Sequence, residues 1–167
     1  VIACDAIRPS SRAKPGKVGT LNCRQGPMRE SIREANENAD VVIVFPHWGV
    51  EYYPTPRTYQ RRLAAEWVDA GADLIIGAHS HFPGGMEDID GRLVFYSLGN
   101  FIFDQDFRQA TMMGLVPEMT FNGDRLVQVW LHTTLIVDTQ PNLANPETDG
   151  QFAYDLVRRG SRGLLDY

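Results

Sequence analysis

The sequence predicts an α/β domain in which a parallel strand–helix–strand core is followed by antiparallel hairpins. Two short apolar runs, residues 41–45 and 74–76, are typical of strands buried on both faces. A helical pattern separates them, and the right-handed crossover of such a unit makes its two strands parallel. Downstream, alternating residues around Asp-Gly and Asn-Gly pairs predict hairpins. With 167 residues, we expect a single domain or part of one.

The first half of the chain alternates helices and strands. Residues 26–38 show a weak helical repeat of apolar positions, and the strand at residues 41–45 follows, ended by Pro46. The clearest helix begins at Thr55 and Pro56, an N-cap and first-turn pair, and runs on to a glycine stop. We expect this helix to pack across the two strands, which should be parallel neighbours or near-neighbours.

The second half reads as antiparallel β structure closed by a helix. Asp90-Gly91 and Asn122-Gly123 are predicted hairpin turns, because such pairs readily adopt the left-handed backbone of two-residue turns. A final helix is predicted for residues 146–159, with Gly160 as its stop. The alternating runs beside the turns are residues 92–96, 112–121 and 126–137.

Charge and composition argue against a nucleic-acid-binding surface. The formal net charge is −5 and the isoelectric point is near 5.3, whereas a surface that neutralises phosphates needs clustered lysine and arginine. Only Arg57, Arg61 and Arg62 form a cluster, which is too small for that purpose. We therefore expect no nucleic-acid partner.

The two cysteines and the first residues leave the cellular compartment open. Cys4 and Cys23 either form one disulfide or remain two small buried hydrophobic residues. No apolar run approaches the roughly 18 residues of a membrane span, and the start lacks the basic-then-apolar order of a signal peptide. Because residues 1–3 read as a strand already under way, we expect further residues upstream of Val1.

Three of the four histidines follow the two predicted parallel strands. His47 comes directly after the first strand, and His79 and His81 come after the second. The carboxyl ends of parallel strands meet at one edge of a sheet, so these side chains should lie together. In extended backbone His79 and His81 would point to the same face, with Ser80 pointing away. The sequence therefore predicts a shared site for one or two divalent metal ions.

A lone histidine is more often a surface residue or a hydrogen-bonded core residue than a ligand. His132 alternates within a predicted strand and is left outside the site for that reason. Tyr52, Tyr53 and Arg57 could line a cleft for an anionic substrate, but an arginine beside a helix start is usually solvated. These three residues are also left outside the site.

Three motifs resemble, in order and spacing, the C-terminal motifs of the CapA-type capsule-biosynthesis proteins. They are PHWGVEY at residues 46–52, GAHSH at residues 77–81 and YSLGNFIFD at residues 96–104. That family is associated with bacterial poly-γ-glutamate synthesis and is similar to the calcineurin-like metallophosphoesterases. The resemblance runs from about residue 39 to residue 104, and it implies half of a calcineurin-like metallophosphoesterase sandwich.

The resemblance assigns the same three histidines to the metal site. His47 matches the lone metal-binding histidine of the phosphoesterase fold, and His79 and His81 match its Gly-His-x-His element. At Ala78 the family usually carries a further histidine, a difference that should weaken supporting contacts only. Imidazole and carboxylate ligands accept Mn, Fe or Zn.

Two further residues of the motifs are candidate catalytic groups. Glu51 could be a carboxylate that orients an imidazole, or a solvated loop acid. Asn100 could be a polar group facing the metals, or it could close a tight turn after Gly99. We place both in the predicted catalytic set beside the histidines.

The N-terminal metal-ligand motifs of such enzymes are missing from the sequence. Asp5 is the only early carboxylate in a suggestive place, and because Ile7 stands where a second ligand would be wanted, Asp5 is read as a structural or capping residue. We therefore expect this chain to be the C-terminal half of the family's domain.

Two functions follow from these expectations. The first is a metal-dependent, phosphoesterase-like hydrolase associated with capsule poly-γ-glutamate synthesis, acting on an anionic small molecule or polymer. The second is a non-catalytic accessory domain that binds polyanion or partner proteins, such as other capsule-synthesis proteins or a missing N-terminal segment, during polymer assembly or export. The resemblance implies the bacterial cell envelope or an extracytoplasmic location for either.

Overall fold

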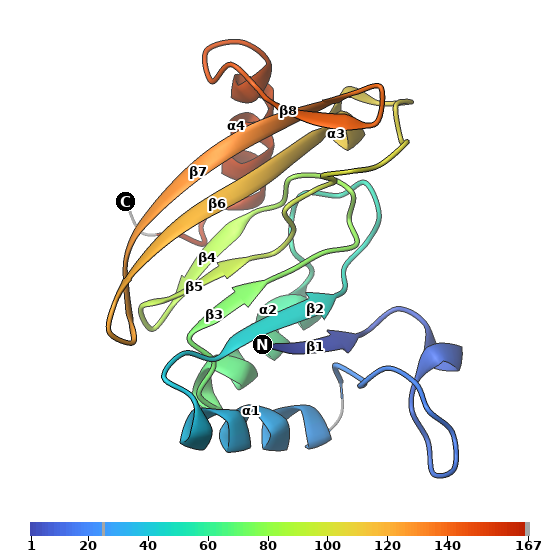
Figure 1. The fold of residues 1–167 in the computed structure, drawn as a ribbon, viewed down its shortest axis with the longest axis vertical. Helices are drawn as coiled ribbons and strands as arrows, with labels where there is room; N and C mark the ends of the chain where they lie inside the picture. Colours follow the sequence, from blue (N-terminus) through green and yellow to red (C-terminus); the bar gives the residue numbers. More distant parts are fainter. Residues whose placement is uncertain (25, 166–167) are drawn as a thin grey trace.

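The computed structural model describes residues 1–24 and 26–165 and contains two β-sheets and four α-helices within them (Figure 1). The first sheet has five strands in the order β1-β2-β3-β5-β4, and the second has three in the order β6-β7-β8. The strands of the first sheet are β1 (Ile2–Asp5), β2 (Ile43–His47), β3 (Leu74–Ile76), β4 (Met86–Ile89) and β5 (Arg92–Phe95). Those of the second are β6 (Met113–Asn122), β7 (Arg125–Val137) and β8 (Gln140–Leu143). The helices are α1 (Gly26–Asn38), α2 (Thr58–Asp69), α3 (Gln109–Met112) and α4 (Asp149–Gly160), with a 3₁₀ turn at Pro9–Ser11.

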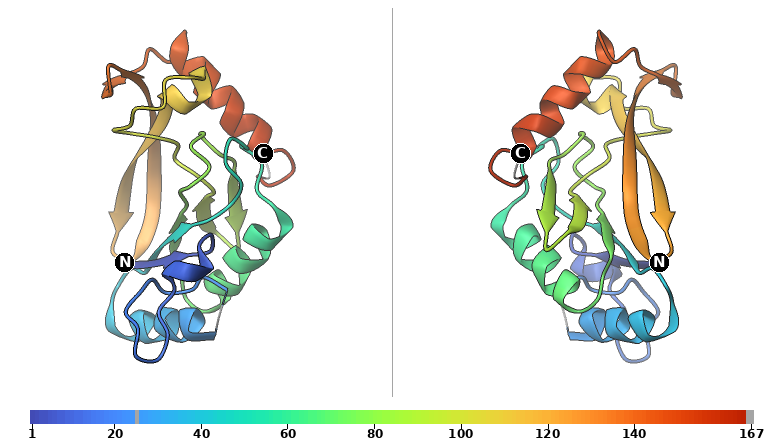
Figure 2. Two further views of the ribbon diagram at one scale, coloured as in Figure 1. Left: turned by 90° about the vertical axis from the view of Figure 1, so that its right-hand side faces the viewer. Right: turned by 90° about the vertical axis from the view of Figure 1, so that its left-hand side faces the viewer.

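The predicted α/β fold class and its parallel core are confirmed. Strands β1, β2, β3 and β5 run parallel, β4 is antiparallel to β5, and Ile43 lies opposite Leu74. Figure 2 shows α2 on the side of the five-stranded sheet that faces away from β6 and β7. The main core lies between the helices and that sheet, where Val44, Trp67 and Ile75 are fully buried.

The predicted boundaries of β2 and α2 were wrong. Strand β2 continues through Pro46 to His47, because a proline removes only the N–H of its position and the Pro46 carbonyl still accepts the N–H of Ala78 at 3.0 Å. The expectation of burial on both faces also fails, since the Phe45 side chain is 41% exposed. Helix α2 begins at Thr58 instead of Pro56, because the Gln60 side chain accepts the Arg57 N–H at 2.9 Å.

The antiparallel second half is confirmed, with one hairpin that the sequence did not indicate. Asp90 and Gly91 both have left-handed backbone, as a two-residue turn between β4 and β5 requires. The β6–β7 hairpin turns just after Asn122. The missed turn joins β7 to β8 through Asp138 and Thr139. Both residues adopt left-handed backbone, and neither is the glycine that usually indicates such a turn in a sequence.

Helix α4 packs on β6 and β7 and begins three residues later than predicted. Ala153 and Val157 of this helix form a small core with Met113 and Leu115. Gly160 is the last helical residue and not the stop beyond it. Met112, predicted to begin the strand, is instead the last residue of α3.

The two sheets join at a seam, which we define as residues 98–100 and their β6 partners. The Leu115 N–H donates to the Leu98 carbonyl at 2.8 Å, and Gly99 forms a bridge with Gly114. The motif segment that carries Asn100 therefore lies where the five-stranded sheet meets the three-stranded sheet.

Cys4 and Cys23, whose state the sequence left open, form a disulfide that links β1 to the segment before α1. Both residues are buried, at 6% and 1% exposure. Among the described helices, none has the length and apolarity that a membrane crossing demands.

Candidate functional site

The structure brings the three predicted histidines together at the carboxyl edge of β2 and β3. His47 is the last residue of β2 and pairs with Ala78, directly before His79. The Trp48 N–H donates to the Ala78 carbonyl at 3.1 Å, which fixes this edge. The ring centroids of His47 and His79 are 4.6 Å apart, and those of His79 and His81 are 6.2 Å apart. The three side chains are therefore neighbours without converging on a single point.

The backbone that holds His79 and His81 is not extended, so that part of the prediction was wrong. Their φ angles are 104° and 59°, and Tyr52 on the facing loop has φ 61°. Such left-handed conformations cost a residue other than glycine roughly 1–3 kcal/mol and persist only where the surroundings impose them. Here the Tyr52 N–H donates to the Ser80 carbonyl at 2.7 Å and ties the two loops together.

Asn100 sets the orientation of His81 and the position of its proton. The Asn100 Nδ2 group donates to the Thr111 carbonyl at 2.9 Å, so its Oδ1 faces His81 Nδ1 at 2.8 Å as an acceptor. His81 Nδ1 must then carry a hydrogen, and in the neutral ring this tautomer leaves the lone pair of Nε2 free. Asn100 is 8% exposed and His81 is half-buried, and a hydrogen bond of this kind orients a metal-binding imidazole.

The electrostatics of the site favour neutral imidazoles at His47 and His79. Protein atoms that displace water lower the pKa of His47, an effect that the carboxylate of Asp5 opposes. Burial likewise lowers the pKa of His79, with a further lowering from His47 and a partial opposition from Glu51. Neutral imidazole is the form that offers a lone pair to a metal ion.

Asp5 lies beside the site, which sequence reasoning missed. It ends β1 directly opposite His47 in the parallel register. The structural role predicted for Asp5 is confirmed, because its carboxylate holds the following loop by accepting the Ile7 N–H at 2.7 Å and the Ser11 hydroxyl at 2.8 Å, although it caps no helix. Burial alone would raise the pKa of Asp5, but these hydrogen bonds, the Arg8 N–H and the charge of His47 together lower it. The missed signal was the strand at residues 2–5, whose carboxyl end falls on the same edge.

Glu51 and His132 form no hydrogen bond with the three clustered histidines among the described residues. Glu51 is exposed on the loop after β2, and within the described residues no hydrogen bond joins it to a histidine. Its effect on the site is electrostatic, through His79. His132 is exposed on β7 and pairs with Glu118 at 3.0 Å, away from the three histidines.

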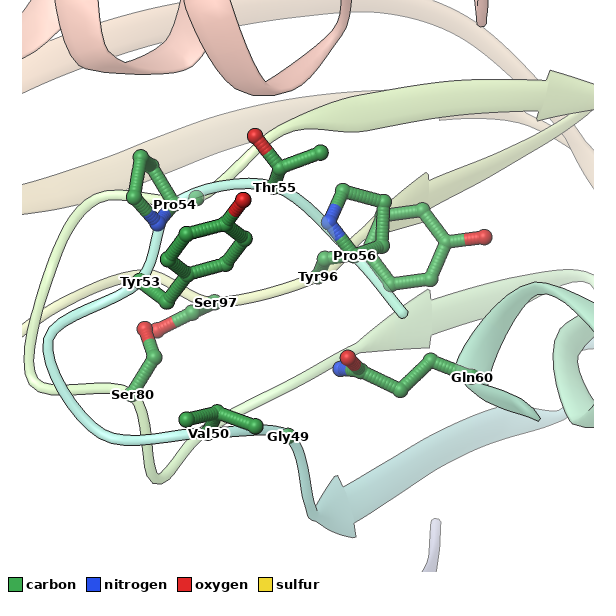
Figure 3. A pocket seen from close by; sticks show the side chains of 11 residues that line it. Gly49, Val50, Tyr53, Pro54, Thr55, Pro56, Gln60, Ser80, Tyr96 and Ser97 are labelled. Carbon is green, nitrogen blue, oxygen red and sulfur yellow. The ribbon is translucent and has the colours of Figure 1, made fainter. Parts of the chain in front are cut away.

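Two hollows border the site. The pocket in Figure 3, between the loop after β2 and the segment at Tyr96 and Ser97, has a volume of about 10 Å³, room for about one water molecule. It is too small for a substrate. A larger open hollow of about 290 Å³ is lined by Asp5 and His47 together with Ala3, Cys4, Thr20 and Leu21.

The donor types fit a divalent metal, although the side chains are not arranged around one point. Within residues 1–24 and 26–165, no three His, Cys, Asp or Glu side chains are placed closely enough to hold a single ion. The observation in favour of a metal is the chemistry of the donors: two imidazoles with lowered pKa and a third whose Nε2 is left free by Asn100.

Comparison with known proteins identifies the family. Residues 3–105, which include every residue of the candidate site, match the family described as bacterial capsule synthesis protein PGA_cap. The chain belongs to this family. The PGA_cap chain is 47% identical over 104 residues to the PGA biosynthesis protein CapA of Bacillus subtilis (strain 168), an alignment that covers 62% of the chain. It is 35% identical over 130 residues to the capsule biosynthesis protein CapA of Bacillus anthracis, covering 75% of the chain.

The match covers a minor part of these relatives. The PGA_cap chain spans 27% of the length of the Bacillus subtilis protein and 32% of that of the Bacillus anthracis protein. It also matches 16% of the length of an uncharacterised protein, y4sH, of Sinorhizobium fredii at 34% identity. Membership of the family is therefore established for this segment, which carries the histidine site.

Proposed function

We propose that this chain is the histidine-bearing part of a metal-dependent, phosphoesterase-like hydrolase that acts in capsule poly-γ-glutamate synthesis. The observation that carries the proposal is the grouping of three imidazoles at one sheet edge, one of them with its proton held on Nδ1 by Asn100. Membership of the capsule synthesis family and the names of the Bacillus relatives support the cellular role.

His47, His79 and His81 would hold one or two divalent ions, of which Mn, Fe and Zn suit such ligands. Bound there, the metal would polarise a phosphoryl oxygen and lower the pKa of a water molecule. Burial favours the neutral form of His47 and His79, and the hydrogen bond to Asn100 leaves the Nε2 lone pair of a neutral His81 free. Asp5 adds a negative charge beside His47 that favours cation binding.

A metal titration of the purified chain tests this proposal. We expect the wild-type chain to bind zinc or manganese in isothermal titration calorimetry, and the His79→Ala variant to bind at least about tenfold more weakly. The matched control is His132→Ala, which removes an exposed histidine outside the site and should bind like the wild type. Equal binding by all three proteins would refute the assignment.

Hydrolysis by this chain alone should be weak. The Asp5 carboxylate already accepts hydrogen bonds from the backbone and from Ser11, so it is a poor candidate for a carboxylate that bridges two metals. We expect metal-dependent cleavage of a generic phosphodiester by the chain to be no faster than cleavage by His79→Ala. Robust turnover that depends on His79 would contradict this expectation and would require a carboxylate such as Asp5, Glu51 or Asp104 to complete the site.

A second candidate function is a non-catalytic accessory domain that binds polyanion or partner proteins. The observation that favours it is the lack, among the described residues, of a three-ligand group already closed around one point. The same titration separates the two candidates, because the accessory domain requires no metal at His79.

We also propose an extracytoplasmic or envelope location. The Cys4–Cys23 disulfide supports it, since disulfides persist mainly in oxidising compartments outside the cytosol. Determining the thiol content of the protein isolated from its natural source tests this point, and two free thiols would contradict it.

A further inference from the structure

Three planar groups are layered along one side of the histidine cluster. The Tyr52 ring stacks on the His81 ring with centroids 6.0 Å apart and planes inclined by 28°. The Arg108 guanidinium carbon lies 5.0 Å from the Tyr52 ring centroid and 5.8 Å from that of Phe107. Arg108 is therefore held beside the site through Tyr52 and not by a contact with a metal-ligand candidate.

We propose that Arg108 is an oxyanion-positioning residue for the ligand of the histidine site. This inference rests on the proposed function in one respect, because it assumes that a ligand lies at that site. The group it would bind is a carboxylate or phosphate carried on a flexible molecule. A guanidinium whose face rests on an aromatic ring keeps its N–H edge free, and that edge matches two oxygens of a carboxylate or phosphate.

The charge of Arg108 has no acidic partner in the described part of the chain. Arg61 pairs with Glu87 at 2.7 Å, and Arg92 pairs with Asp73 at 3.0 Å. Arg108 is exposed and forms no such ion pair within residues 1–24 and 26–165. An unpaired guanidinium fixed by stacking is pre-organised for an external anion, since less conformational entropy is lost when the anion binds.

The strained backbone of Tyr52 indicates that its position has a functional role. Its backbone is left-handed, and its N–H is fastened to the Ser80 carbonyl between the two histidines of the GAHSH motif. Strain of this kind clusters at ligand-binding and active sites. The strained residue is the one that links the guanidinium to His81.

Exposed aromatic side chains lie next to the layer formed by His81, Tyr52 and Arg108. The Phe103 ring lies 5.3 Å from the His81 ring and is 39% exposed, and Phe107 meets Tyr52 edge-on at 5.7 Å and is 57% exposed. Large apolar side chains left in solvent beside a polar cluster mark a binding surface. The proposed oxyanion-binding surface therefore places a guanidinium beside exposed aromatic rings.

Binding measured without metal tests the inference. The probes are a fluorescently labelled γ-linked glutamate decamer, followed by fluorescence anisotropy, and inorganic tripolyphosphate, followed by calorimetry, both in the presence of EDTA. Arg108→Gln should bind the preferred probe about tenfold or more weakly, as expected for the loss of charge-assisted hydrogen bonds. Arg108→Lys should bind with intermediate affinity because it keeps the charge and loses the planar fork. The matched control is Arg125→Gln, which removes an exposed arginine at the opposite end of the β6–β7 hairpin from α3 and should bind like the wild type.

The outcomes separate this inference from the proposed hydrolase. A preference for the decamer identifies a carboxylate ligand, and a preference for tripolyphosphate identifies a phosphate ligand. Wild-type affinity of Arg108→Gln for both probes, or of Arg108→Lys for the preferred one, would overturn the inference, as would failure of the wild-type chain to bind either. Zinc binding by Arg108→Gln should equal that of the wild type. If the wild-type chain binds no zinc while Arg108→Gln still loses probe affinity, the hydrolase fails and the oxyanion site stands.

Discussion

Substitution of Gly77 by alanine should disrupt the edge that carries the histidines. A Cβ atom at this position would lie 2.3 Å from the Tyr96 carbonyl oxygen and 2.4 Å from Trp48 Nε1. Both neighbours are constrained, because the Trp48 indole N–H donates to that same carbonyl at 3.1 Å and the indole stacks with both Trp67 and Tyr96. Relief of the clash requires a shift of about 1 Å at the end of β3, far more than a packed core accommodates without strain.

The size of the effect follows from the two contacts that must change. Overpacking of a core costs about 1–3 kcal/mol. A buried hydrogen-bonding group left without its partner costs about 1–3 kcal/mol more. We therefore expect Gly77→Ala to lower the free energy of unfolding by about 3–5 kcal/mol. The displaced strand end should also weaken metal binding, because His79 follows Gly77 by two residues.

Urea unfolding followed by tryptophan fluorescence measures the stability, and calorimetric titration with zinc measures the site. The control is Gly26→Ala, at the start of α1, where an added Cβ would meet nothing within 4 Å and where alanine is the better helix former. If Gly77→Ala unfolds within about 1 kcal/mol of the wild type, which is the usual range for tolerated core changes, then β3 does not approach β5 and Trp48 as closely as described, and the account of this edge is wrong.

Three further predictions concern the core, a buried tyrosine and the disulfide. Trp67→Ala should cost about 3–5 kcal/mol, because Trp67 is fully buried against Trp48, whereas Trp130→Ala, at 60% exposure, should be nearly neutral in the same urea experiment. Burial, followed by the hydrogen bond to Glu87, raises the pKa of Tyr96 above its ordinary value of about 10. Above that pH the native state keeps a proton that the unfolded chain releases, so the free energy of unfolding should fall as the pH rises. The Tyr96→Phe variant should lose this part of the pH dependence. Joint replacement of Cys4 and Cys23 by alanine should lower the stability measured by thermal unfolding by about 3 kcal/mol, because the disulfide closes a loop of about 20 residues in the unfolded chain. Reductant should lower the stability of the wild type by the same amount. A wild type whose stability does not respond to reductant would argue against the disulfide.

The elements that the sequence predicted best were those with a strong local pattern. The run at 74–76 and the Asp90-Gly91 turn match the structure closely, because burial and left-handed backbone leave few alternatives there. The errors arose where tertiary contacts overrode local rules. Pro46 remained in β2 because its carbonyl is still paired, and Gln60, a side chain inside the helix, set the start of α2.

The sequence predicted which histidines lie together, but it did not predict their backbone conformation. The grouping of His47 with His79 followed from the parallel crossover alone. The left-handed backbone of His79 and His81 had no sequence signal, because residues other than glycine seldom adopt it and here the contacts of the surrounding loops impose it. The roles of Asp5 and Asn100 depended on register and on one hydrogen bond across the fold, which no local pattern encodes.

The seam between the two sheets connects the histidine site to the second half of the chain through hydrogen bonds. Asn100 stands in the seam and is held on one side by the Thr111 carbonyl just before β6 and on the other by His81. A rotation of the three-stranded sheet against the five-stranded sheet would pull this amide along with β6, since Gly99 and Leu98 are bridged to that strand. The imidazole of His81 would then lose its acceptor and become free to exchange tautomers. The α4 helix and the β6–β7 hairpin are thus connected through the seam to the hydrogen bond that orients one imidazole.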